Sequence, residues 1–292
     1  MARKRNSERF GIPDTSIPED DTSSVASLAA AGGSSGDIFS FVTPTEFVDL
    51  PSKGVFYPEG HPLAEVDNLE IRHMTAKEED ILTSESLLKK GIAVDRLLQS
   101  VIVDKSIRVD DLLIGDKNAL IIATRITGYG PRYATSVACP LCKEINETVF
   151  DLSELGPNDI SHPPESVETN TAGNFTFTLP RSEVEVEVRL LTSKDERTMA
   201  RATEKKKKLK LPDTRSTDLL KLVTVSVDGR TDGESLNKFI EHMPLQDVKH
   251  LRKIYEQIKP DINITYDFEC DHCSHEGEVR MPLTAQFFWP NT

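Results

Sequence analysis

Two stretches of the chain alternate apolar and polar residues and then continue into a capped helix. The first runs from Leu69 to Glu79 (LEIRHMTAKEE) and the second from Val186 to Glu196 (VEVRLLTSKDE). A side-chain period of two is typical of a half-buried strand. The two stretches also resemble each other residue by residue, at an offset of 117 positions. We therefore expect the same strand–helix unit to occur twice in the fold.

The start of each expected helix carries the spacing of a capping box. Thr75 stands three positions before Glu78, and Ser193 stands three positions before Glu196. In a capping box the hydroxyl accepts from a backbone N–H of the first turn, and the carboxylate reaches back to the N-cap. Both pairs predict where a helix begins.

Further segments repeat in the same order along the chain. They are Leu97–Asp104 with the apolar run Leu219–Asp228, Gly115–Leu120 with Gln246–Leu251, and two CxxC motifs, the last two pairs at an offset of 131. Segments that repeat in the same order along a chain indicate a duplicated structural unit. We therefore predict an α+β fold of two related halves, each with the order strand, helix, helix, helix and zinc-binding hairpin. A chance likeness between two α/β segments is the alternative.

All four cysteines lie in the two CxxC pairs, Cys139 with Cys142 and Cys270 with Cys273. Two intervening residues let a tight turn point both thiolates at one metal ion, and two such turns complete the four-sulfur shell typical of Zn²⁺. The 127 residues between the pairs (270 − 142 − 1) exceed the spacer of a compact zinc finger. A duplicated fold accounts for this spacing, because each half supplies one pair. We predict one structural Zn²⁺ ion shared by both.

Strand-like segments flank both pairs, as in the hairpins of a zinc ribbon. His272 and His275 stand beside the second pair as alternative ligands. The other interpretations are free structural cysteines, a redox dithiol and a disulfide framework. A redox CxxC belongs at a helix N-terminus, and a disulfide framework belongs to exported proteins. The flanking segments are Arg132–Ala138, Glu147–Leu152, Asn263–Glu269 and Glu276–Met281.

The remaining segments complete the expected domain organisation. The C-terminal aromatics Phe287, Phe288 and Trp289 are expected to seal the fold, with a docking anchor as the alternative. The apolar residues of the Pro/Gly-rich segment are expected to pack on the core, with partner binding as the alternative; they are Phe47, Val48, Leu50, Val55, Phe56 and Tyr57. The divisions are a disordered arm (1–40), an extended Pro/Gly-rich segment (41–65), the first half with its CxxC knuckle (66–152), a linker (153–174), and the second half with its CxxC knuckle and aromatic C-terminus (175–292).

Charge and hydropathy exclude several function classes. The chain has 35 Lys and Arg against 48 Asp and Glu, a formal net charge of −13, which disfavours non-specific nucleic-acid binding. The run Lys205–Lys210 is expected to be a solvated helix end, with a phosphate or acidic-protein contact as the alternative. No stretch has the length and apolar character of a membrane span, and the basic N-terminus lacks the apolar core of a secretory signal. We expect a soluble, intracellular protein.

The usual catalytic motifs are absent from the sequence. There is no phosphate-binding glycine loop, GxSxG, HExxH or kinase motif set, and the histidines are scattered. We therefore expect no catalytic residues and no enzyme activity.

Several motifs together resemble one family. They are LPSKGVFYPEGHPL from Leu50, IRHMTAKEEDILT from Ile71, LLKKG from Leu87, the two CxxC pairs and the terminal FFWP. In this combination the chain resembles the baseplate hub subunit and hub-assembly proteins of T-even-like contractile-tailed bacteriophages, over roughly residues 44–292. The most specific parts are Leu50–Gly54 with Tyr57 and Pro58, and Met74–Leu82.

The resemblance implies a non-enzymatic tail protein that takes part in the structure or assembly of the baseplate hub by docking onto other phage baseplate or tail proteins. It implies the host cytoplasm during assembly, where thiolates stay reduced, and the virion baseplate if the protein is retained there. The alternatives are a transient hub-assembly chaperone and, outside this family, a nucleic-acid-binding zinc ribbon or a thiol oxidoreductase. The resemblance implies one site in this chain, the metal site formed by Cys139, Cys142, Cys270 and Cys273.

Overall fold

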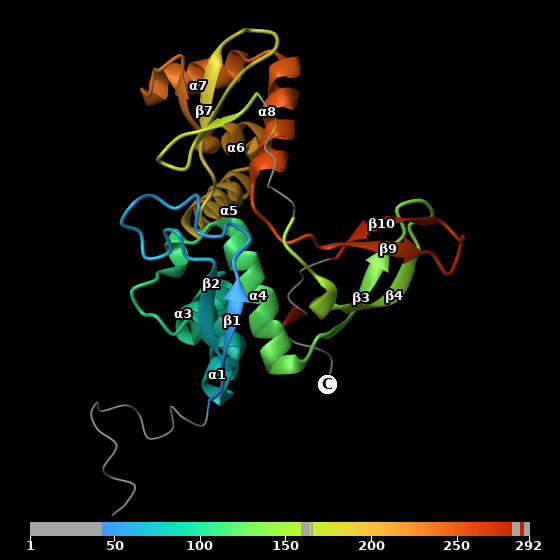
Figure 1. Cartoon of the computed structure of the whole chain (residues 1–292). Coiled ribbons are helices and arrows are strands. Elements are labelled where there is room, and N and C mark those ends of the chain that lie inside the picture. The colour runs from blue at the N-terminus through green and yellow to red at the C-terminus, as the bar shows by residue number, and fades with distance from the viewer. Residues whose placement is uncertain (1–42, 159–163, 165, 282–286, 289–292) are drawn as a thin grey trace, which may run out of the picture. The chain divides into compact units, whose positions relative to one another are not determined.

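The computed structural model describes residues 43–158, 164, 166–281 and 287–288, which form a mixture of helices and small sheets (Figure 1). The chain divides into two compact units, Met1–Val42 and Thr43–Thr292, and the described residues all belong to the second. The expected arm 1–40 and Trp289 therefore lie outside the described residues. Among the helices described, none has the length and apolar character needed to cross a membrane.

The elements up to residue 151 begin with a strand pair and end with another. They are β1 (Thr45–Asp49), β2 (Asn68–Arg72), α1 (Ala76–Thr83), α2 (Glu85–Lys89), α3 (Ala93–Val101), η2 (Val109–Asp111), α4 (Ile114–Tyr129), β3 (Arg132–Ala138) and β4 (Ile145–Asp151).

The elements after residue 151 again place helices between strands. They are η3 (Leu152–Glu154), β5 (Glu168–Thr169), β6 (Phe175–Thr178), β7 (Glu185–Val188), α5 (Ser193–Lys208), α6 (Arg215–Val223), β8 (Thr224–Val227), α7 (Gly233–His242), α8 (Leu245–Ile258), β9 (Thr265–Glu269) and β10 (Glu276–Arg280). Strand β5 lies inside the range 153–174 that was expected to be a linker.

The described strands form three antiparallel pairs and one larger sheet. The pairs are β1 with β2, β3 with β4 and β9 with β10, and the four-stranded sheet has the order β5-β6-β7-β8. The buried apolar side chains form one cluster, to which both runs of elements contribute. Leu97 and Leu120 from the first run and Val186 from the second are fully buried in it.

A loop after β1 is fixed by a buried carboxylate in the first turn of α4. Asp116 accepts hydrogen bonds from the backbone N–H (2.9 Å) and hydroxyl (2.6 Å) of Ser52 and from the hydroxyl of Tyr57 (2.7 Å). Burial raises the pKa of Asp116, although these three donors oppose the shift. Gly54 closes the same loop at a φ of +71°, where a Cβ would lie 2.3 Å from the backbone N of Val66. The segment starting at Leu50 is thereby held against the core.

A second buried carboxylate makes a similar contact in α8. Asp247 accepts from the backbone N–H groups of Arg181 (2.8 Å) and Ser182 (3.0 Å), which follow β6. The hydroxyl of Tyr255 accepts from the backbone N–H of Leu191 (3.2 Å). The first turns of α4 and α8 therefore each anchor a loop that follows a strand.

The apolar residues of the segment 41–65 divide between core and surface. Val48, Leu50 and Tyr57 are buried, which confirms the expected core packing for these side chains. Phe47 and Val55 are 68% and 63% exposed, so for them the expectation was wrong. Phe47 lies on β1 opposite Glu70 of β2, on the outer face of this strand pair.

The first capping box is confirmed. Thr75 is the N-cap of α1, and the carboxylate of Glu78 accepts from both the backbone N–H (3.0 Å) and the hydroxyl (2.6 Å) of Thr75. Arg72 and Ser100 also donate to Glu78 at 2.6 Å each.

The second capping box was predicted one residue too late. The N-cap of α5 is Thr192 and its partner is Asp195, whereas Ser193 is the buried first residue of the helix. Glu196 instead pairs with Lys117 of α4 (2.9 Å). The backbone N–H of Ser193 is already bonded to the carbonyl of Leu112 (2.8 Å), which places Ser193 inside the fold and leaves the cap to Thr192.

The C-terminal aromatics that the structure describes pack into the fold. Phe287 and Phe288 are buried, in agreement with a sealing role. The buried guanidinium of Arg125 donates to the carbonyl of Phe287 (2.7 Å) and to that of Gly130 (2.9 Å). Arg125 thus joins the end of α4 to the C-terminal segment.

Glu78 gives a pH-dependent prediction. Burial raises its pKa, but hydrogen bonds from Ser100, Thr75 and Arg72 outweigh burial and hold the pKa at about 2, below its ordinary value of 4.5. The contribution of Glu78 to stability is therefore complete above pH 4.5 and decreases as the pH falls toward 2. Glu78→Gln should lower the free energy of unfolding at pH 7 by about 3 kcal/mol.

The measurement is denaturant unfolding of the wild type and Glu78→Gln between pH 7 and pH 3, with exposed Glu79→Gln on the same helix as control. The difference between wild type and Glu78→Gln should shrink by about 2 kcal/mol at the acid end. A difference that stays constant with pH would contradict the ionised, hydrogen-bonded carboxylate.

Candidate metal centre

The first CxxC pair occupies the loop between β3 and β4. The backbone N–H of Cys139 donates to the carbonyl of Glu144 (2.9 Å), and the N–H of Lys143 donates to the carbonyl of Cys139 (3.0 Å). Lys143 adopts a left-handed φ of 68°, which turns the chain after Cys142. The antiparallel register places Ala138 opposite Ile145 directly below this loop. The strands thus hold both ends of the cysteine turn.

The second pair lies in a loop of the same kind between β9 and β10. Here the N–H of Cys270 donates to the carbonyl of His275 (3.0 Å), and the N–H of Ser274 donates to the carbonyl of Cys270 (2.9 Å). Ser274 has a φ of 50°. Glu269 and Glu276 face each other below the loop. The two cysteine loops therefore have the same backbone hydrogen-bond pattern, each with a left-handed residue after its second cysteine.

The two loops bring the four sulfur atoms together. All four Sγ atoms lie within 4.8 Å of one another, although the pairs are far apart in sequence. Cys139 Sγ is 3.8 Å from Cys273 Sγ, and Cys142 Sγ is 3.7 Å from Cys270 Sγ. All four cysteines are free. Within the described part of the chain they form the one group of metal-ligating side chains close enough to share an ion.

This arrangement fits a tetrahedral ion. Metal–sulfur bonds of about 2.3 Å in a regular tetrahedron separate the sulfurs by about 3.8 Å. Two of the sulfur–sulfur distances between the loops, 3.7 and 3.8 Å, agree with that separation. A shell of four thiolates is typical of structural zinc, whereas catalytic zinc keeps an open position for water. The four cysteines can therefore hold a metal ion, and their chemistry is that of a structural site.

The thiol pKa values differ across the cluster. Burial raises the pKa of Cys270, but the backbone N–H groups of His272 and Cys273 outweigh burial and lower it to about 6. Burial, together with the three neighbouring sulfurs, raises the pKa of Cys273 to about 12. Burial also acts on Cys139, where N–H groups from the same turn still lower the pKa. A cluster of this kind cannot ionise fully by itself, and a bound cation removes the mutual repulsion of its thiolates.

Asn146 connects the two cysteine loops, and the sequence interpretation missed it. The side chain is buried in β4, accepts from the backbone N–H of Asp271 (2.9 Å) and donates to the carbonyl of Glu144 (3.1 Å). The available signal was a polar residue at an inward position of the strand, between exposed Ile145 and Glu147. Such an inward polar side chain usually has a specific partner.

The two hairpins also contact each other below the sulfurs. The hydroxyl of Tyr266 in β9 donates to the carbonyl of Asp151 at the end of β4 (2.8 Å). The rings of Phe150 and Tyr266 lie 4.7 Å apart. The cluster is therefore built on two hairpins that pack together through side chains as well as sulfurs.

The two histidines suggested as alternative ligands are not part of the cluster. His272 is exposed, and His275 takes part in the loop through its backbone carbonyl. A redox dithiol is disfavoured because each CxxC pair lies between two strands rather than at a helix N-terminus.

Comparison with known proteins gives one match. The family model described as T4 bacteriophage base plate protein matches residues 44–289. The search of curated proteins and the search of solved structures gave no match.

Zinc content tests whether the two loops share one ion. The purified full chain should contain one zinc per chain, and Cys139→Ser and Cys270→Ser should each abolish it rather than halve it, because each removes a ligand of the same ion. Each variant should also lower the melting temperature by roughly 10 °C, since structural zinc contributes several kcal/mol. Metal analysis and thermal unfolding measure both effects.

His272→Ala serves as the control, because it removes a nearby potential ligand that lies outside the sulfur cluster. It should retain zinc and melt like the wild type. If either serine variant kept full zinc content and stability, a shared site would be contradicted.

Proposed function

Because the chain belongs to the family of T4 bacteriophage base plate proteins, we propose that it takes part in the structure or assembly of the baseplate hub, without catalysis, by docking onto other phage tail proteins. The observation that carries this proposal is the family match over residues 44–289, which spans the described helices and strands. The protein is accordingly located in the virion tail or, during tail assembly, in the host cytoplasm.

The proposed cofactor is one structural Zn²⁺ ion, held by Cys139, Cys142, Cys270 and Cys273. The mutual distances of the four sulfurs and the shared geometry of the two loops support it. When bound, the ion would supply four metal–sulfur bonds across two segments that the sequence separates widely. The chain's own residues already orient both loops through the bond from Asp271 to Asn146. The role of the site is to stiffen a docking protein.

We also propose that the fold arose from two related halves, 66–152 and 175–292, with 153–174 between them. Support comes from corresponding positions that make similar contacts. These are the ion pairs of Arg72 with Glu78 and of Arg189 with Asp195, and the left-handed residues Lys143 and Ser274. The bridge between Ile71 and Ile102 likewise has its counterpart in the pairing of Val188 with Thr224.

Retention in the particle distinguishes a hub component from a transient assembly chaperone. Mass spectrometry of purified intact phage, quantified against known baseplate proteins, should find this chain at a small fixed copy number, because a structural docking protein stays in the baseplate. Infected-cell extracts provide the comparison sample.

Detection only in extracts and assembly intermediates would support the chaperone role instead. Absence from both particles and assembly intermediates would contradict the baseplate proposal as a whole.

A further inference from the structure

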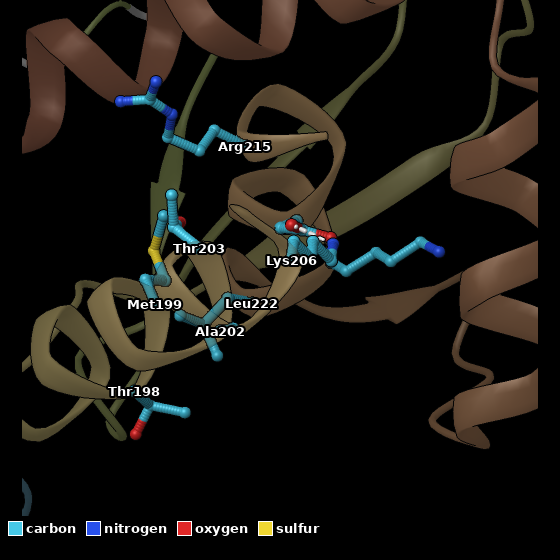
Figure 2. A pocket seen from close by; sticks show the side chains of 9 residues that line it. Thr198, Met199, Ala202, Thr203, Lys206, Arg215 and Leu222 are labelled. Carbon is cyan, nitrogen blue, oxygen red and sulfur yellow. Dashed lines mark hydrogen bonds and ion pairs between the residues drawn. The ribbon is translucent and has the colours of Figure 1, made fainter. Parts of the chain in front are cut away.

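A groove lies between helices α5 and α6 and takes no part in the cysteine cluster. Its volume is about 230 Å³, and a neighbouring hollow of about 310 Å³ shares several of its lining residues. In Figure 2, Arg215 lies at one end of the lining and Thr198 at the other, with Met199, Ala202 and Leu222 between them.

The floor of the groove is apolar. Met199 and Ala202 come from α5 and Leu222 from α6, and Ala202 is exposed. Beyond the C-terminus of α5, Leu209 and Leu211 are 59% and 53% exposed. This concentration of accessible apolar side chains offers room for at least one apolar side chain of a partner.

The rim of the groove is basic, in contrast to the rest of the chain. The segment 193–223 has ten Lys and Arg against five Asp and Glu, a net charge of +5, while the whole chain has −13. The cations that line the groove itself are ion-paired: Lys206 with Asp218 (2.6 Å), Arg215 with Asp213 (2.7 Å) and Lys221 with Glu241 (2.6 Å). Among the described residues, Lys207 has no ion-pair partner, and it lines the neighbouring hollow. The unpaired positive charge of Lys207 therefore lies in the hollow next to the groove with the apolar floor.

We propose that this groove docks an acidic segment of another protein, with one apolar side chain of that segment inserted between α5 and α6. Charge complementarity selects an acidic partner, and the apolar floor selects a partner that carries an apolar anchor. A nucleic acid fits less well, because the lining has no aromatic ring for base stacking and carries the carboxylates of Asp213 and Asp218. The inference does not rest on the baseplate function or on the metal site.

Fluorescence anisotropy with the full chain tests both parts of the proposal. The probe is a short labelled peptide of aspartate and glutamate with one central leucine, and its control has serine in place of leucine. The leucine peptide should bind about tenfold more tightly than the serine peptide, because only the leucine side chain gains from burial on the apolar floor. A thymidine oligonucleotide of matched charge should bind more weakly than either.

Two variants locate the binding. Ala202→Phe should fill the groove and remove the preference for leucine, while Ala200→Phe, at an exposed position of the same helix outside the lining, should leave it intact. Lys207→Glu should weaken both peptides several-fold, whereas Lys249→Glu on exposed α8 surface should not. Thermal unfolding of each variant verifies that it is folded.

Equal affinity for the leucine and serine peptides, no binding of either, or an unchanged preference in Ala202→Phe would overturn the proposal. Tighter binding of the oligonucleotide would assign the surface to nucleic acid instead. Self-association of the wild type that Lys207→Glu abolishes in sedimentation would identify the occupant as a second copy, and would also overturn it.

Discussion

Four sulfur atoms lie within 4.8 Å of one another, although they come from two parts of the chain separated by 128 or more positions. Each contributing loop belongs to a two-stranded hairpin, and an isolated hairpin of this kind is marginally stable in water. The contacts from Asp271 to Asn146 and from Tyr266 to Asp151 join the hairpins but leave four thiols crowded together. A cation bound by these thiols would remove the crowding and stiffen the junction, as we propose.

Buried carboxylates have a similar organising role away from the sulfurs. Asp116 in α4 and Asp247 in α8 each accept backbone hydrogen bonds from the loop that follows a strand. Each aspartate lies in the first turn of its helix, where the unpaired N–H groups favour negative charge. The loops beginning at Leu50 and Leu179 are thereby fixed to the helices that lead toward the two cysteine hairpins. The LPSKG motif is thereby fixed to α4, the helix that precedes the first cysteine hairpin.

The sequence predicted the elements that depend on local spacing. The CxxC pairs between strands and the capping box of Thr75 with Glu78 are present as expected, because both follow from short-range patterns. Contacts between distant segments were not predictable in this way. The backbone N–H of Ser193 bonds to Leu112, which moves the second cap to Thr192, and Asn146 gains its role only when the second hairpin packs against the first. The exposure of Phe47 likewise depends on which face of β1 meets the core.

We propose that both cysteine loops bind the same structural ion. X-ray absorption spectroscopy at the zinc edge of the full, zinc-loaded chain measures the ligand shell directly. A shared ion should have four sulfur neighbours at about 2.3 Å and no lighter atom in its shell. A shell with only two sulfurs, or one completed by nitrogen or oxygen, would show that the two loops do not share the ion.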